Sequence, residues 1–402
     1  MPVWLDAIPE KAPKIVRPST GRWLLFLAFV MLGGIALTLW CWTSERTGFV
    51  FWFTALGLPF CTWGLIFGLR RFAYKAEQVG AESRNVEREA LIDSEILRGQ
   101  RCAWILGTYI QSPAGNKADD LLKAMKVAAP VIEFSRPRGC DKPVRYAALP
   151  EYQTDLTKAL KAAVNKLTTR VEGIVKPLPP ELPCWLVLDC DSDVYPLFEE
   201  QLKADLSLKT GRIFRLMVGK GLGAFDAWLD KRWDTPGILV AITLSLPASP
   251  REEEADAVSM VVLSNRKAHA WPDALRLHRP ERGTETTLTK TLTRALLWSK
   301  TLPNELKGSW ISGPTLTSGS GWNNACEESE VEFSLSEDNS SIDPVLGYTG
   351  HAAPWLAITL ANAGVEQRGS QVIAAQPAAD KDDIWVAVIT KEEVRKESPK
   401  NV

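Results

Sequence analysis

Histidine is scarce in this sequence, and its cysteines are not spaced as metal ligands. The chain has three histidines and seven cysteines, and no two cysteines form a Cys-x-x-Cys pair. Zinc sites need clustered Cys and His ligands at characteristic spacings. We therefore expect no bound metal and no cofactor, and we interpret the scattered cysteines as reduced, structural thiols.

An excess of charge of either sign is also absent. Lysine and arginine together number 47 against 48 acidic residues, which gives a net charge of −1 and a pI of about 6.4. Proteins that follow a nucleic-acid backbone carry a basic stripe or patch. The composition therefore argues against nucleic acid as a partner.

Phosphate-binding loops are not complete either. Gly219, Gly221 and Gly223 approach the GxGxxG pattern, but residue 224 is alanine, and GxxxxGK[ST] does not occur. A phosphate loop is one interpretation of these glycines. We favour the other, a glycine turn that leads into a helix over 224–233.

Long uncharged apolar runs are what the sequence has instead. One runs from Trp23 to Trp42 and a second from Phe49 to Leu69. At 1.5 Å per helical residue, each covers the roughly 30 Å of bilayer hydrocarbon. We predict two membrane-spanning helices over 23–69. A cleavable signal peptide is the alternative, but no small-residue cleavage site is present and a second run follows at once.

Cations flank the predicted hairpin on both outer sides, whereas the loop between the spans offers only Arg46. The positive-inside rule then places both flanks, and the large remainder of the chain, in the cytoplasm. The flanking cations are Lys11, Lys14, Arg17 and Arg22 before the first span and Arg70, Arg71 and Lys75 after the second.

The remainder of the chain alternates apolar runs with amphipathic helical patterns, which is typical of an α/β domain with a largely buried sheet. We predict a cytoplasmic segment over 1–22, the hairpin over 23–69, a helical stalk over 70–99, the domain over 100–391 and a charged tail over 392–402. The strands predicted most strongly are 237–246 and 383–390. The segment from Gly308 to Glu330 is rich in glycine and serine and is expected to form loops.

Three stretches resemble the thiolase-like fold of the ketoacyl synthases, in the family's order. They are WILGTYIQSPAG (104–115), ADAVSMVVLSNRKAHA (255–270) and VLGYTGHAAPWLAITLA (345–361). The resemblance implies a layered α/β domain, from about residue 100 to 390, with two related halves that meet centrally.

Of the family's catalytic residues, the resemblance places only one, His351. The family's lysine position is Leu346, no histidine matches the earlier His-Gly-Thr motif, and no cysteine opens a buried helix. Cys326 is expected in a polar loop. A cysteine nucleophile needs activation by a helix N-terminus or a base. We therefore expect no catalytic residues and treat His351 as a vestigial candidate that packs before a helix over 352–361.

Bacterial type VI secretion lipase adaptors are similar to this description. The resemblance implies an inactive, two-pass protein of the bacterial inner membrane, with its globular domain in the cytoplasm. Its partners would be a lipase effector and a spike protein of the secretion machinery. An acyl-thioester enzyme and a structural membrane component of a secretion or envelope complex remain alternatives. Five tryptophans fall in segments expected at the surface, where an aromatic can anchor a partner, although a core position is the alternative: Trp271, Trp298, Trp310, Trp322 and Trp355.

Overall fold

The computed structural model describes residues 5–128, 130–379 and 381–392, and the chain divides into two compact units. One unit covers residues 4–95, and the other runs from residue 96 onward. Of the charged tail predicted over 392–402, only Glu392 lies within the described residues.

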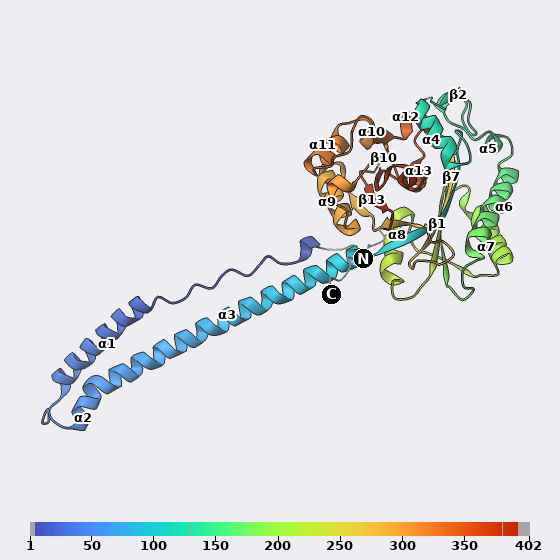
Figure 1. The fold of residues 1–402 in the computed structure, drawn as a ribbon. Helices are drawn as coiled ribbons and strands as arrows, with labels where there is room; N and C mark the ends of the chain where they lie inside the picture. The colour runs from blue at the N-terminus through green and yellow to red at the C-terminus, as the bar shows by residue number, and fades with distance from the viewer. Residues whose placement is uncertain (1–4, 129, 380, 393–402) are drawn as a thin grey trace, which may run out of the picture. The chain divides into compact units, whose positions relative to one another are not determined.

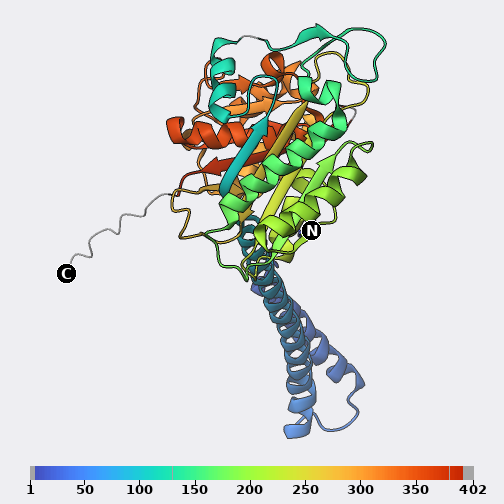
Figure 2. The ribbon, with the colours of Figure 1, turned by 90° about the vertical axis from the view of Figure 1, so that its right-hand side faces the viewer.

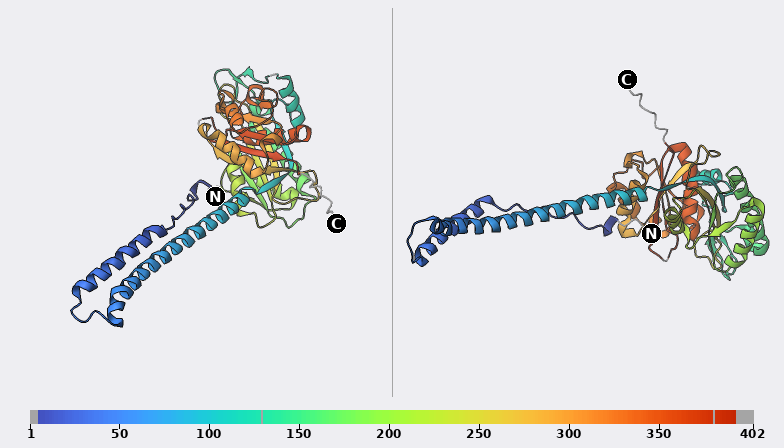
Figure 3. Two further views of the ribbon diagram at one scale, coloured as in Figure 1. Left: turned by 60° about the vertical axis from the view of Figure 1, so that its left-hand side comes forward. Right: turned by 90° about the horizontal axis from the view of Figure 1, so that it is seen from below.

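The first unit is a helical hairpin in which α1 runs beside α3 (Figures 1 and 3). After a short 3-10 turn, Leu5–Ala7, helix α1 spans Thr20–Cys41. The second arm begins with α2, Phe49–Trp52, continues through a π-helical turn and becomes α3, Leu58–Gly99. The stalk predicted over 70–99 is thus continuous with the second apolar run.

Both arms are long and apolar enough to cross a membrane. Their large side chains are mostly exposed: Phe29 is 75 % and Trp40 is 90 % accessible. The arms still make specific contacts, because the Trp63 indole Nε1 donates a 3.0 Å hydrogen bond to the carbonyl of Trp23. The Trp23 ring also packs against Phe67 of the other arm, with centroids 5.4 Å apart.

The second unit is built on one mixed sheet of eleven strands among the described residues. A separate hairpin pairs β2, Glu133–Ser135, with β3, Val144–Tyr146. The strands of the large sheet are β1 Cys102–Gln111, β4 Cys184–Cys190, β5 Phe214–Leu216, β6 Ile238–Ser245, β7 Ala257–Ser264, β8 Leu275–His278, β9 Glu281–Gly283, β10 Ser309–Ser312, β11 Asn339–Ser341, β12 Gln371–Ala375 and β13 Ile384–Thr390.

The large sheet consists of two halves with the same strand order. One half reads β5-β4-β6-β7-β1 and the other β11-β10-β12-β13-β8. In each half the first three strands are parallel and the next two pairings are antiparallel. The halves join where β1 pairs with β8, with Cys102 opposite His278. The two related halves expected from the sequence are therefore present.

The helices of this unit fill the connections between strands and cover the sheet. They are α4 Ala118–Val127, α5 Pro150–Thr154, α6 Leu156–Val175, α7 Tyr195–Thr210, α8 Gly221–Lys231, α9 Leu288–Ser299, α10 Pro314–Thr317, α11 Gly321–Glu328, α12 Asp343–Leu346 and α13 Ala353–Arg368, with 3-10 turns at Glu285–Thr287, Pro303–Glu305 and Gly350–Ala352 (η5).

Five layers result, which Figure 1 shows side-on. Helices α6 and α7 lie side by side across the outer face of the first half (Figure 2) and share one hydrophobic cluster with β4, β6 and β7. Helices α9 and α11 cover the second half in the same way. Between the two half-sheets lie α8 and α13, whose cluster takes side chains from both halves. Small buried residues such as Ala357 and Ala361 let α13 fit into this middle layer.

The two strands predicted most strongly are confirmed. Strand β6 is buried along its whole length, and β13 is buried except at its partly exposed residues Trp385 and Thr390. The prediction of loops over 308–330 was wrong. That segment contains β10, α10 and α11, because its few large residues, Trp310, Leu316 and Trp322, are spaced to enter the core.

Candidate functional site

The two central helices begin at equivalent places in the two halves. Helix α8 follows β5 and α13 follows β11, and each leads into the next strand of its half, β6 or β12. They meet through Phe225 and Trp355, whose rings pack edge to face at 6.4 Å. The turn before α13, η5, also lies against β4, β6 and β7. The ends of α8 and α13 are therefore where the halves could jointly build a site.

His351 lies in η5 and is bonded to the first half. Its Nε2 lies 2.8 Å from the carbonyl oxygen of Leu244, near the end of β6. Since a carbonyl can only accept, Nε2 carries the proton and the imidazole donates. Gly350 permits this close approach, because it has a φ of +54° and a β-carbon there would lie 3.3 Å from the Ser245 hydroxyl. The Nε2 proton of His351 is therefore already donated to a backbone carbonyl of the first half.

Leu346 and Asp343 lie on the short helix α12 just before that turn. Leu346 is buried in the central cluster, so this position contributes packing rather than charge. Asp343 accepts hydrogen bonds from the Ser312 hydroxyl at 2.5 Å and from the Gly313 amide at 2.7 Å. Burial raises the pKa of Asp343 to about 6, although both hydrogen bonds act in the opposite direction. This carboxyl ties the turn after β10 to α12.

The entrance of α8 contains Lys220 and Gly221. The predicted glycine turn into a helix is confirmed, since Gly219 and Gly221 have φ values of +108° and +52° and α8 begins at Gly221. The helix starts three residues earlier than expected. Lys220 reaches Asp189 at the end of β4, with Nζ 3.4 Å from Oδ1. No cysteine lies in this turn, which runs Met-Val-Gly-Lys-Gly from residue 217 to 221.

The cysteines of the domain lie elsewhere. Cys184 and Cys190 end β4, as the sequence suggests, but Cys326 is buried in α11 rather than in a polar loop. Burial raises the pKa of Cys102 to about 11 and that of Cys190 and Cys326 to about 12. Thiols with raised pKa values remain protonated and are poor nucleophiles at neutral pH.

Four of the five tryptophans expected at the surface are in the core. Trp271 is partly exposed, while the side chains of Trp298, Trp310, Trp322 and Trp355 are 0–2 % accessible. Their large apolar area is more favourably buried between sheet and helices than left in water. Their positions therefore do not mark a partner surface.

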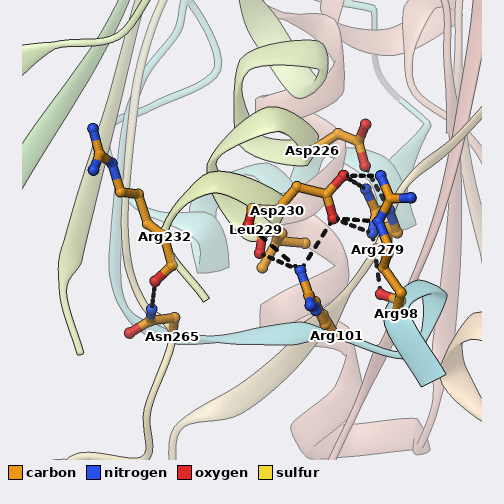
Figure 4. Close-up of polar contacts among 8 residues, drawn as sticks. All are labelled: Arg98, Arg101, Asp226, Leu229, Asp230, Arg232, Asn265 and Arg279. Atoms are coloured by element: carbon orange, nitrogen blue, oxygen red, sulfur yellow. Dashed lines mark hydrogen bonds and ion pairs between the residues drawn. The ribbon is translucent and has the colours of Figure 1, made fainter. Parts of the chain in front are cut away.

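A buried charge cluster lies at the opposite end of α8 (Figure 4). Asp230 accepts from Arg279 at 2.8 and 3.0 Å and from Arg98 at 2.6 and 3.1 Å, and Arg101 approaches it at 3.3 Å. Asp226, one helical turn earlier, pairs with the Arg279 Nε at 2.6 Å. The cluster fixes the last residues of α3 and the loop after β8 to α8.

The two aspartates of this cluster differ in electrostatics. Burial alone would raise the pKa of Asp230, but hydrogen bonds from Arg98 and Arg279 lower it well below its usual value. Burial dominates at Asp226 and raises its pKa. This cluster was not predicted from the sequence. The i, i+4 spacing of Asp226 and Asp230 on a buried helix was the available signal.

Comparison with solved structures gives similarity to ketosynthases at low sequence identity. An oxazolomycin ketosynthase domain from Streptomyces albus is similar with a TM-score of 0.52 and 10% identity, over 74% of this chain and 76% of that one. The ketosynthase from module 1 of the bacillaene synthase of Bacillus amyloliquefaciens gives 0.50 and 9%, over 74% and 77%. No family model and no curated protein matches the sequence.

The second unit has a ketosynthase-like fold. Identities near 10% establish this fold and nothing about chemistry. The thiolase-like, layered α/β architecture expected from three short stretches is therefore supported. Which catalytic groups the chain has must be decided from its own residues.

Proposed function

We propose that this chain is a membrane-anchored, catalytically inactive adaptor with a ketosynthase-like domain. It binds a lipase effector and delivers that effector to the type VI secretion machinery. The domain lies in the cytoplasm, and the helical hairpin holds it at the bacterial inner membrane. The observation that carries the proposal is the entrance of α8, which holds Lys220 and Gly221 and no cysteine.

The loss of acyl-transfer chemistry is supported by both central helices. A thioester enzyme of this fold needs an activated nucleophile at a buried helix entrance, with further groups that stabilise the oxyanion. In this chain Lys220 pairs with Asp189, His351 donates to the Leu244 carbonyl, and Leu346 is packed in the core. None of these three side chains is a thiol or hydroxyl nucleophile, and the Lys220 amine is a cation held in an ion pair.

Membrane anchoring is supported by the exposed apolar surface of the hairpin. Leu25, Phe29 and Phe49 are each more than 70 % accessible, on helices long enough to span a bilayer. Soluble monomers rarely expose continuous apolar surface of this extent. Insertion into a lipid bilayer would remove the free-energy cost of exposing this apolar surface to water. The cations before the first span and after the second favour the cytoplasmic side for the domain.

A protein-binding role is supported by the edge strand β5. Among the described residues it pairs only with β4, so its other side offers unpaired backbone groups. The residues around it are apolar and exposed: Leu208 is 83 %, Ile213 is 81 % and Val218 is 91 % accessible. Such an edge suits a partner that adds a strand and buries apolar side chains. We assign the effector to this edge.

Co-purification from the bacterium that encodes the chain tests the proposal. The tagged full chain, extracted in detergent, should bring down a soluble lipase and a spike protein, identified by mass spectrometry. The variant I213K/V218D should lose the lipase at least tenfold. The control V127K/L302D alters two other exposed apolar residues, away from β5, and should retain it.

Two results would overturn the proposal. Recovery of membrane proteins alone would favour a structural component of an envelope complex. Recovery of a second copy of this chain that I213K/V218D disrupts, without a lipase, would assign the β5 edge to self-association.

A further inference from the structure

The helical unit contains a cavity of about 420 Å³ beside the start of α1. It is formed by the segment just before α1 and by the part of α3 that follows the second apolar run. Its charged lining residues are all cations: Arg17, Arg70, Arg71 and Lys75. The cavity therefore gathers four positive charges from two separate segments of the chain.

Nearby acidic groups neutralise this charge only weakly. No carboxylate is among the residues that line the cavity. Arg70 approaches Glu77 at 4.0 Å, with both side chains about half exposed, and an ion pair of that kind is weak. Lys75 donates to the neutral amide oxygen of Gln78 at 3.2 Å. Like charges held this close repel each other, so a bound anion would stabilise the arrangement.

The position of the cavity at the ends of the two apolar runs identifies the source of that anion. Thr20, the first residue of α1, lines it, and Arg70 directly follows Leu69, the last residue of the uncharged run. Tyr74 also lines it, and tyrosine side chains favour the boundary between hydrocarbon and headgroups. At this boundary the abundant anion is a lipid phosphate. Leu65 and Leu69, both more than 60 % accessible, provide an apolar surface for its acyl chains.

We propose that this cavity binds the headgroup of an anionic phospholipid from the cytoplasmic leaflet. The inference rests on the membrane insertion proposed above. Cations that only orient the spans would need no common cavity, whereas these converge on one with hydroxyl and amide groups from Thr20, Tyr74 and Gln78. Basic pockets at the cytoplasmic ends of membrane helices bind phosphate headgroups in this manner. The site would also fix the chain at anionic regions of the membrane.

Lipid retention by the full chain tests the site. The chain is reconstituted in nanodiscs of phosphatidylcholine and phosphatidylglycerol at equal amounts, extracted in mild detergent, and analysed by native mass spectrometry. Wild type should retain phosphatidylglycerol at least tenfold over phosphatidylcholine. R70Q/R71Q should lose this preference. K14Q/R22Q removes two cations from the flank before the first span that do not line the cavity, and it should keep the preference.

Four other outcomes would contradict the proposed lipid site, and they can be told apart. Equal retention of both lipids by an inserted wild-type chain, or equal losses in the two double variants, would overturn the lipid site and leave the membrane anchor standing. Displacement of the lipid by millimolar inorganic phosphate would assign the cavity to a free anion and overturn the lipid proposal. A chain that fails to enter the nanodiscs would overturn both the anchor and the site.

Discussion

His351 and Lys220 each lie just before one of the two central helices, yet their environments differ. His351 is bonded to a backbone carbonyl of the other half, and Lys220 is an exposed cation paired with the buried carboxylate of Asp189. A histidine whose Nε2 proton is bound to backbone acts as a structural hydrogen-bond donor. This geometry explains why the residue pins a turn without needing a catalytic partner.

Replacement of His351 with alanine should lower the free energy of unfolding by about 1–3 kcal/mol, the cost of losing a partly buried hydrogen bond. Denaturant unfolding of the full chain in detergent measures this, and effector binding by the folded fraction should be unchanged. The exposed His269 provides the control, since H269A should change stability by less than about 0.5 kcal/mol. An equally stable H351A would contradict the role.

Asp343 should make stability depend on pH. Its pKa in the folded state is raised to about 6, so the folded chain keeps a proton that the unfolded chain releases near pH 4. The stabilisation from this group is therefore complete below about pH 4 and is lost as pH rises through 6. The stability difference between wild type and D343N, measured by denaturant unfolding from pH 4 to 7, should fall across this window. A difference that rises with pH would refute the assignment.

Elements with strong periodic patterns were predictable from the sequence, and those with weak ones were not. Continuous apolar runs predicted β6 and β13, and the stripe of leucines and valines predicted α6. Strand β10 and helix α11 were missed because glycine and serine dominate their segment. The side chains of Trp310 and Trp322 are buried in the core and hold these elements there, through contacts that form only in the folded chain. Long-range packing of this kind overrides local composition.

The anchor of α8 at the arginine cluster can be tested with Asp230→Asn. The change leaves Arg279, which is 1 % accessible, with a weaker set of acceptors. Removing one partner of a buried ion pair costs about 3–5 kcal/mol. Thermal unfolding of the full chain should show that loss. D193N, which breaks a more exposed pair with Arg138, should leave the unfolding midpoint almost unchanged. Similar midpoints for the two variants would show that the cluster is not structural.

At the scale of the whole molecule, the fold could be predicted from the sequence, but only some of the residues at the candidate site could. Three short stretches pointed to two related halves, and the identical strand orders bear this out. Sequence reasoning noted the missing lysine at Leu346. It did not place Lys220 at the α8 entrance or find Asp189 and Asp343, because the partners Lys220 and Asp189, and likewise Ser312 and Asp343, are about thirty residues apart and meet only when their own half has folded. The cationic cavity likewise required two segments about fifty residues apart to converge.

Acyl-thioester turnover by the purified full chain in detergent tests the central claim most directly. The assay follows decarboxylation of malonyl thioester and acyl transfer from an acyl thioester at neutral pH. The account predicts that wild type, H351A and a blank without protein give the same rate, because no cysteine lies at the α8 entrance. A wild-type rate above the blank that disappears in H351A would show that the domain is an enzyme and contradict the adaptor account.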